Sequence, residues 1–162
     1  MTTITLRSPH GRITTEQRRT LAQSLTDAVL EVEVGQLAAA ARAGFQFWFR
    51  EFDATEVAIG GVLLCDQPTP TDVVLVDIVV MDGHWPDTDR AQVIRNVYAA
   101  LTTALECDKP PPGWWATFQV IDDGSWGSRG GVLSILDLLG TGVFMYERAE
   151  AIRRAIGTRL RR

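Results

Sequence analysis

The stretch that decides the fold is TTITLRSPHGRITTEQRRTLAQSLTDAVLEV, residues 2–32. Residues 3–7 have the composition of a β-strand, and the turn residues around Gly11 predict that the strand ends there. Thr14 and Gln17 have the spacing of a capping box, which predicts the start of a helix. Apolar residues then recur at steps of three and four and predict one buried stripe on that helix: Leu21, Leu25, Ala28, Val29 and Val32.

This strand–helix unit occurs a second time in the chain. An apolar strand at 73–80 leads to a turn and to a helix start near Asp87, and each helix is followed by a further strand, at 45–52 and at 115–121. Both halves then contain Gly-Gly-Val. We interpret this as a tandem duplication within one domain, with a first repeat at about 2–66, a second at about 72–140 and a helical tail at about 144–162.

Composition excludes several classes of protein. The chain has 162 residues, 46% of them apolar, which is enough to build a core and too much for a disordered chain. A net charge of −4 argues against a protein that binds nucleic acids or anionic membranes non-specifically, because such binding needs clustered cations. We interpret the basic tail as a solvated helix end, where cations are favoured; its arginines are Arg148, Arg153, Arg154, Arg159, Arg161 and Arg162.

No apolar run is long enough to span a bilayer, and the amino terminus lacks the apolar region of a signal peptide. We therefore expect a cytoplasmic protein. Cys65 and Cys107 stand alone in the sequence, without a second cysteine or histidine at metal-ligand spacing. Two free thiols are expected, with no disulfide, no metal site and no cofactor.

The order of the elements predicts an α+β fold. Each strand–helix–strand unit leaves its two strands parallel, so two units give a four-stranded sheet with two helices on one face. The run at 73–80 is so apolar that we expect it to be buried on both faces. The second face of the sheet would then be too apolar to face water, which predicts an oligomer in which Asp77 is paired across the interface. Residues 33–44 are expected to form a connection, and the last helix at 146–160 to dock through an apolar stripe.

Five segments taken in order resemble the tautomerase superfamily. They are the turn and helix start at 11–14, the helix segment at 25–28, the aromatic strand end at 49–51, and the glycine pairs within 60–62 and 126–131. The likeness is to fused two-repeat members related to cis-3-chloroacrylic acid dehalogenase and malonate semialdehyde decarboxylase. The resemblance implies a homotrimer. It also implies chemistry at an amino-terminal proline, whose nitrogen acts as acid or base while nearby cations bind a substrate carboxylate.

The resemblance places Thr2 where that proline stands. The amine of Thr2 would be free only after loss of Met1, so His84, in the turn of the second repeat, is the other candidate for proton transfer. Arg12 matches the turn arginine that binds the carboxylate. The remaining candidate substrate-binding residues occupy family pocket positions or flank the second glycine pair: Gln46, Thr117, Trp126 and Arg129.

Several functions follow from this resemblance. The first is a keto–enol tautomerase that acts on a small 2-oxo acid or a related enolisable carboxylic acid. The second is an inactive trimeric homologue with a binding or structural role. A hydratase, dehalogenase or decarboxylase of small acids is a further alternative, and an amino-terminal threonine hydrolase is supported only by Thr2. The expected partners are a small carboxylic acid and further copies of the chain.

Overall fold

The computed structural model describes residues 1–159, and its centre is one four-stranded mixed sheet. The strands are β1 (Thr2–Pro9), β2 (Phe45–Phe52), β5 (Val74–Met81) and β6 (Trp114–Ile121). Their order in the sheet is β2-β1-β5-β6. The pairs β1–β2 and β5–β6 are parallel, and the central pair β1–β5 is antiparallel. The predicted α+β class, with two parallel units joined in one sheet, is confirmed.

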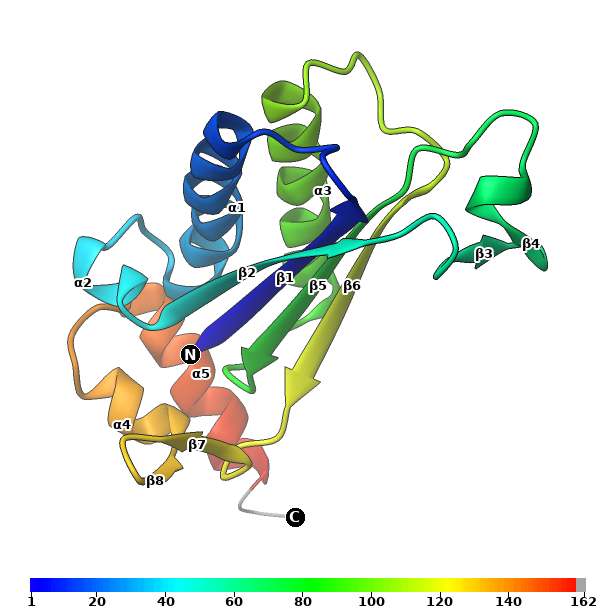
Figure 1. The fold of residues 1–162 in the computed structure, drawn as a ribbon. Helices are drawn as coiled ribbons and strands as arrows, with labels where there is room; N and C mark the ends of the chain where they lie inside the picture. Colours follow the sequence, from blue (N-terminus) through cyan, green and yellow to red (C-terminus); the bar gives the residue numbers. More distant parts are fainter. Residues whose placement is uncertain (160–162) are drawn as a thin grey trace.

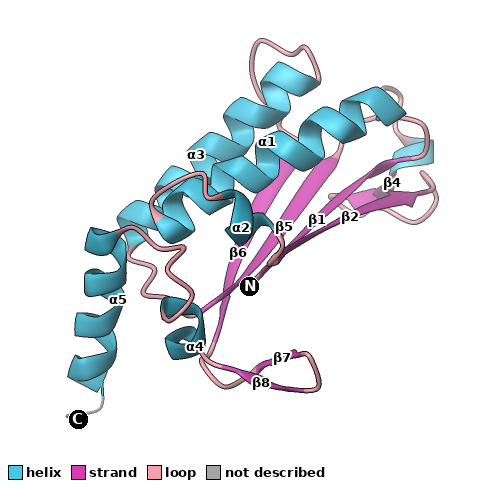
Figure 2. Cartoon of the chain, turned by 90° about the vertical axis from the view of Figure 1, so that its left-hand side faces the viewer, coloured by secondary structure: helices cyan, strands magenta, loops and turns pink. Residues whose placement is uncertain are grey.

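Two long helices, α1 (Thr15–Val34) and α3 (Asp87–Ala104), cover the same face of this sheet (Figure 2). The predicted capping box is present, because Thr14 accepts from the backbone of Gln17 while the Gln17 side chain accepts from the backbone of Thr14. The helix ends where Gly35 adopts a left-handed conformation with φ of 81°. The prediction that the connection begins at residue 33 is therefore wrong, since Glu33 and Val34 belong to the last helical turn.

Each glycine pair lies in a small hairpin, whose turn is formed by Gly60 and Gly61 in the first repeat and by Arg129 and Gly130 in the second. The first hairpin consists of β3 (Ala58–Ile59) and β4 (Val62–Leu63), followed by the 3₁₀ turn Leu64–Asp66, and it projects beyond one end of the sheet (Figure 1). The second consists of β7 (Trp126–Ser128) and β8 (Gly131–Leu133), and it lies near the amino terminus. The remaining helices are α2 (Ala39–Arg42), α4 (Ile135–Leu139) and α5 (Tyr146–Arg159). Both halves of the chain thus contain strand, helix, strand and hairpin in the same order.

No helix among the described residues covers the second face of the sheet (Figure 2). The strand predicted at 73–80 is observed as β5, and within the single chain its Leu75, Asp77 and Val79 are half-buried on the open side. The predicted burial on both faces is therefore not reached by one chain alone. The Asp77 carboxylate is already paired within the chain, with the Arg7 guanidinium and with the Thr117 hydroxyl at 2.7 Å. The open face therefore combines this polar group with the apolar Leu75 and Val79, and its outer strands present the exposed Trp48 and Trp115.

The carboxyl-terminal helix packs at the end of the sheet where the chain begins (Figure 1). The predicted docking stripe is confirmed for Ala149, Ile152 and Ile156, which join a second apolar cluster with Met1 and Met81. Leu160, the last predicted member of that stripe, lies outside the described residues.

The prediction of a solvated basic tail is only partly correct. Arg153 and Arg154 are exposed, as expected for the solvent side of a helix. Arg148 is different, because its side chain is only 11% exposed and donates hydrogen bonds to backbone carbonyls of the main body. Arg161 and Arg162 lie outside the described residues, and the side chain of Arg159 also lies outside what the structure describes.

Candidate functional site

Two adjoining cavities, of about 630 and 640 Å³, open beside the amino terminus. The first reaches toward α1, α2 and α4, and the second runs over the start of β1 toward the hairpin of β7 and β8. Both are lined by Met1, Gly44, Gln46, Ser128 and Arg129. We refer to the two cavities together as the amino-terminal pocket.

Strand topology explains why distant segments meet at this pocket. Because β1 and β2 are parallel, both begin at the same edge, where Thr2 is paired with Phe45. Because β5 is antiparallel to β1, the carboxyl end of β5 reaches that edge too, where Val80 is opposite Thr2. The parallel strand β6 ends there as well and continues into the hairpin that carries Arg129. One edge of the sheet therefore gathers segments from both repeats.

Glu33 contributes a carboxylate to the pocket, although the residue is only 7% exposed. Its Oε2 accepts a hydrogen bond of 2.7 Å from the Thr2 hydroxyl, and its Oε1 lies 3.5 Å from the amino group of Met1. A buried carboxylate is costly unless it is paired, and here a hydroxyl and an ammonium group supply that pairing. Glu33 was not predicted from the sequence, although a signal for it existed. Leu21, Leu25, Val29 and Glu33 follow one another at four-residue steps, which places Glu33 on the buried stripe of the helix.

Thr2 itself is fully buried, with no exposed surface. Its backbone amide donates to the carbonyl of Gly44 at 3.1 Å, and its hydroxyl is bound to Glu33. With Met1 in place, the nitrogen of Thr2 is a peptide nitrogen without basicity. The amine that faces the pocket is therefore that of Met1, and the sequence analysis did not assign it a role.

Three of the predicted substrate-binding residues line the pocket. Gln46 is the second residue of β2 and is exposed, and Trp126 and Arg129 come from the second hairpin. Arg129 occupies the hairpin turn in a left-handed conformation, with φ of 53°. Within residues 1–159, no hydrogen bond or ion pair involves its exposed side chain. Arg129 is thus a cation at the pocket that has not been neutralised by a neighbouring carboxylate.

Arg12 lies at the opposite end of β1 from this pocket, roughly 25 Å away for a strand of this length. Its guanidinium donates two hydrogen bonds to Asp72, at 2.8 and 2.9 Å, and Asp72 also accepts from the indole of Trp114 at 3.1 Å. The hydrogen bond from Arg12 holds the pKa of Asp72 below its ordinary value, and the same bond raises the pKa of Arg12. The resemblance assigned Arg12 to bind the substrate carboxylate. In the single chain, Arg12 is instead bound to Asp72 in a structural ion pair.

Two further predicted site residues do not line the pocket in the single chain. Thr117 lies in the middle of β6 on the open face, bound to Asp77. His84 adopts a left-handed conformation in the loop after β5, with φ of 61°. Its backbone amide donates to Asp82, and its carbonyl accepts from Arg148 at 2.9 Å. The structure therefore gathers Gln46, Trp126 and Arg129 around the amino terminus, and leaves Arg12, His84 and Thr117 apart from them.

Within residues 1–159, no group of three or more histidine, cysteine, aspartate or glutamate side chains is placed to hold a metal ion. Cys65 is exposed and Cys107 half-buried, and both thiols are free, as predicted. None of the helices in the described part of the chain has the length and apolarity needed to cross a membrane.

No protein-family model matches the sequence, and no curated protein matches it either. Solved structures do match the fold. N1, a member of the cis-3-chloroacrylic acid dehalogenase family, is 17% identical with a TM-score of 0.66, over 94% of this chain and 99% of that one. A fused 4-OT solved as an asymmetric trimer is 19% identical with a TM-score of 0.64, over 84% of this chain and 98% of that one.

A third match is macrophage migration inhibitory factor from Toxoplasma gondii, at 14% identity and a TM-score of 0.59, over 81% of this chain and 99% of that one. Each match covers nearly the whole of the known protein, so the likeness extends beyond a single strand–helix unit to the complete sheet. The chain therefore has the fold of the tautomerase superfamily. At these identities the matches establish the fold, and the activity has to be argued from the pocket.

Proposed function

We propose that this chain is a keto–enol tautomerase that acts on a small 2-oxo acid in the amino-terminal pocket. One observation carries the proposal: the nearly buried carboxylate of Glu33 is paired with the amino group of Met1 in a pocket that Arg129 also lines. A carboxylate and an amine in contact provide two proton-transfer groups, and an arginine without a partner provides a site for an anion.

Enolisation of a 2-oxo acid needs three things from a protein. A base must take a proton from C3, a positive group must stabilise the developing charge on the C2 oxygen, and a cation must hold the carboxylate. We assign the base to Glu33, the stabilisation to the amino group of Met1, and the carboxylate to Arg129 with Gln46. In this scheme Arg129 takes the role that the resemblance gave to Arg12, because Arg12 is already bound to Asp72.

The test of this function is the ketonisation of a 2-oxo acid enol, followed by ultraviolet absorbance. We expect the wild-type chain to accelerate the reaction, and Arg129→Gln to raise KM about tenfold or more, since it removes a charged contact worth about 1.5–3 kcal/mol. Arg153→Gln, on the exposed side of α5, is the matched control and should leave the rate unchanged. Activity that is insensitive to Arg129→Gln would contradict the assignment of the carboxylate site.

A second candidate is an inactive homologue with a binding role. The burial of Thr2 favours this candidate, because the resembling family has its catalytic proline at this position. Here Met1 precedes Thr2, and the Thr2 hydroxyl is bound to Glu33, so Thr2 is not accessible to a substrate. This candidate predicts that 2-oxo acids bind to the chain and that their enols ketonise no faster than in buffer. Turnover that depends on Glu33 would exclude it.

We also propose that the chain assembles as a homotrimer through the open face of the sheet. The outer strands expose Trp48 and Trp115 by 44% and 61%, and fused 4-OT structures of this fold are trimers. Sedimentation equilibrium should give three times the mass of the chain, and Trp115→Glu should lower it. Tyr146→Glu, on an aromatic side chain of α5 that is 74% exposed, is the control. A wild-type monomer at micromolar concentration would contradict the trimer.

A further inference from the structure

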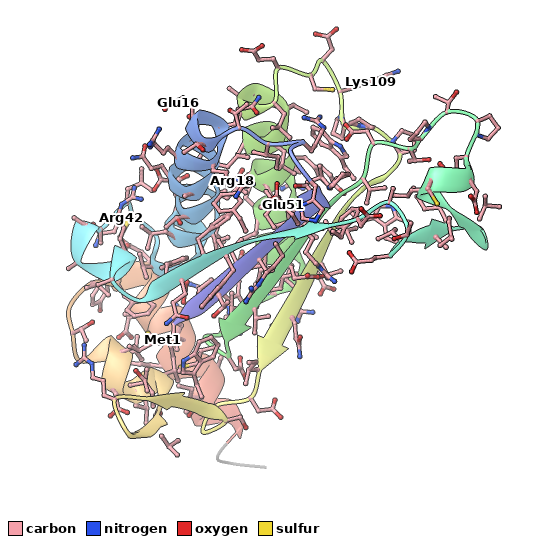
Figure 3. All side chains as sticks on the ribbon, in the orientation of Figure 1. Met1, Glu16, Arg18, Arg42, Glu51 and Lys109 are labelled. Carbon is pink, nitrogen blue, oxygen red and sulfur yellow. The ribbon has the colours of Figure 1, made fainter. Side chains whose placement is uncertain are left out.

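The amino group at the pocket is a primary amine, which can do more than stabilise charge. A primary amine can bond to a carbonyl carbon, as lysine does in enzymes that form Schiff bases. The chain contains a single lysine, Lys109. That residue is exposed in the loop between α3 and β6, at the end of the molecule opposite to Met1 (Figure 3). The amino terminus is therefore the one primary amine of this sequence that lies at the pocket.

We propose that the amino group of Met1 forms an imine with the carbonyl carbon of a 2-oxo acid, so that the substrate is activated covalently. This inference rests on the proposed function, since it takes the same pocket and the same class of substrate. It adds a covalent step that a proton-transfer mechanism does not need.

Imine formation begins at the carbonyl group of the substrate. The neutral amine attacks C2 of the 2-oxo acid, a carbon–nitrogen bond forms, and the carbonyl π electrons pass to the oxygen. The nitrogen, which is positively charged after the attack, then loses a proton, and that proton passes to the oxygen. The resulting carbinolamine loses its hydroxyl group as water after protonation by the Glu33 carboxyl group, and the nitrogen lone pair closes the protonated imine. Removal of a proton from C3 then gives the enamine, the nitrogen counterpart of the enol. Reprotonation and addition of water return the keto acid and the amine.

The groups around the amine can carry out the proton transfers that these chemical steps need. Glu33 lies 3.5 Å from the nitrogen, so it can take the proton of the ammonium and return it to the departing hydroxyl. If the cell removes Met1, the new terminus at Thr2 is again a primary amine, next to a hydroxyl that is bound to Glu33.

Reductive trapping tests the proposal directly. The untagged protein is incubated with pyruvate and sodium cyanoborohydride, digested, and analysed by peptide mass spectrometry. Cyanoborohydride delivers hydride to the imine carbon and fixes it as a secondary amine. We expect one reduced adduct on the amino-terminal peptide, whose mass also reports whether Met1 or Thr2 carries it. Lys109→Arg should leave the yield unchanged, and Glu33→Gln should slow trapping about 100-fold, the loss of an acid–base group.

Each outcome separates the inference from the function on which it rests. A reduced adduct on Lys109 alone, or no adduct at all, would overturn the proposed imine. If the enol of a 2-oxo acid still ketonises under those conditions, the tautomerase proposal stands without the covalent step. An amino-terminal adduct in a protein without ketonisation activity would support the imine and contradict the tautomerase. Equal trapping rates in the wild type and Glu33→Gln would remove Glu33 from the mechanism.

Discussion

Glu33→Gln is expected to lower kcat/KM for ketonisation by about 100-fold to 10,000-fold, the usual contribution of a general acid or base. The amide has nearly the shape of the carboxylate, and its oxygen can still accept the hydrogen bond from the Thr2 hydroxyl. It cannot take a proton at neutral pH. The expected loss is therefore in kcat more than in KM, because Arg129 and Gln46 still hold the substrate.

The matched control is Glu31→Gln, which changes the same chemical group two residues earlier on α1, on the exposed side of the helix. It should retain full activity. Unfolding in urea should show that Glu33→Gln remains folded, so that a loss of rate can be assigned to chemistry. An active Glu33→Gln enzyme would place the proton transfer on another group.

Arg148→Ala is expected to destabilise the chain by on the order of 3 kcal/mol, and hence to lower Tm by about 6–12 °C. The Arg148 guanidinium donates to the carbonyls of Glu33, Gly83 and His84 at 2.9–3.1 Å, and it forms an ion pair with Asp89 at 3.0 Å. It also lies over the ring of Trp85, 5.3 Å from the centroid. Truncation would leave buried acceptors without donors, and each of these has a desolvation cost.

The control for this change is Arg153→Ala on the same helix. Arg153 is exposed and pairs with Glu150, three residues before it, so its removal should cost no more than about 0.5 kcal/mol. Thermal unfolding monitored by circular dichroism compares the two variants. Equal Tm values for both would mean that α5 is not held to the body by Arg148. Since Arg148 binds the backbone of Glu33, its loss should also lower activity.

The fold could be predicted because its signals are local and occur twice. The capping box at Thr14, the apolar stripe after it and the second strand–helix unit all depend on residues close in sequence. The open face was harder to judge. The run at 73–80 is apolar enough to suggest burial on both sides, but Asp77 is bound by Arg7 and Thr117 on neighbouring strands. No periodicity within one strand reveals such a pairing.

The site was predicted less completely, for a related reason. Gln46 was identified by position in the resembling family, and Trp126 and Arg129 by their place beside the second glycine pair; all three line the pocket. Arg12 was identified in the same way as Gln46, but its partner Asp72 lies in the segment before β5, and sequence spacing does not show that the two meet. Glu33 was missed although its position on the buried stripe of α1 was visible in the sequence. The predicted connection began at residue 33, so Glu33 was placed outside the helix to which it belongs.

Exchange of the C3 protons of a 2-oxo acid in D₂O, followed by proton NMR, tests the central claim most directly. Enolisation at the amino-terminal pocket predicts that the untagged protein replaces the methyl protons of pyruvate, or the C3 protons of a larger 2-oxo acid, with deuterium faster than buffer alone. Glu31→Gln should retain this exchange, and Glu33→Gln should lose it. Exchange at the buffer rate for every 2-oxo acid tried, by a folded protein, would contradict an enolising site at the pocket of Met1 and Glu33.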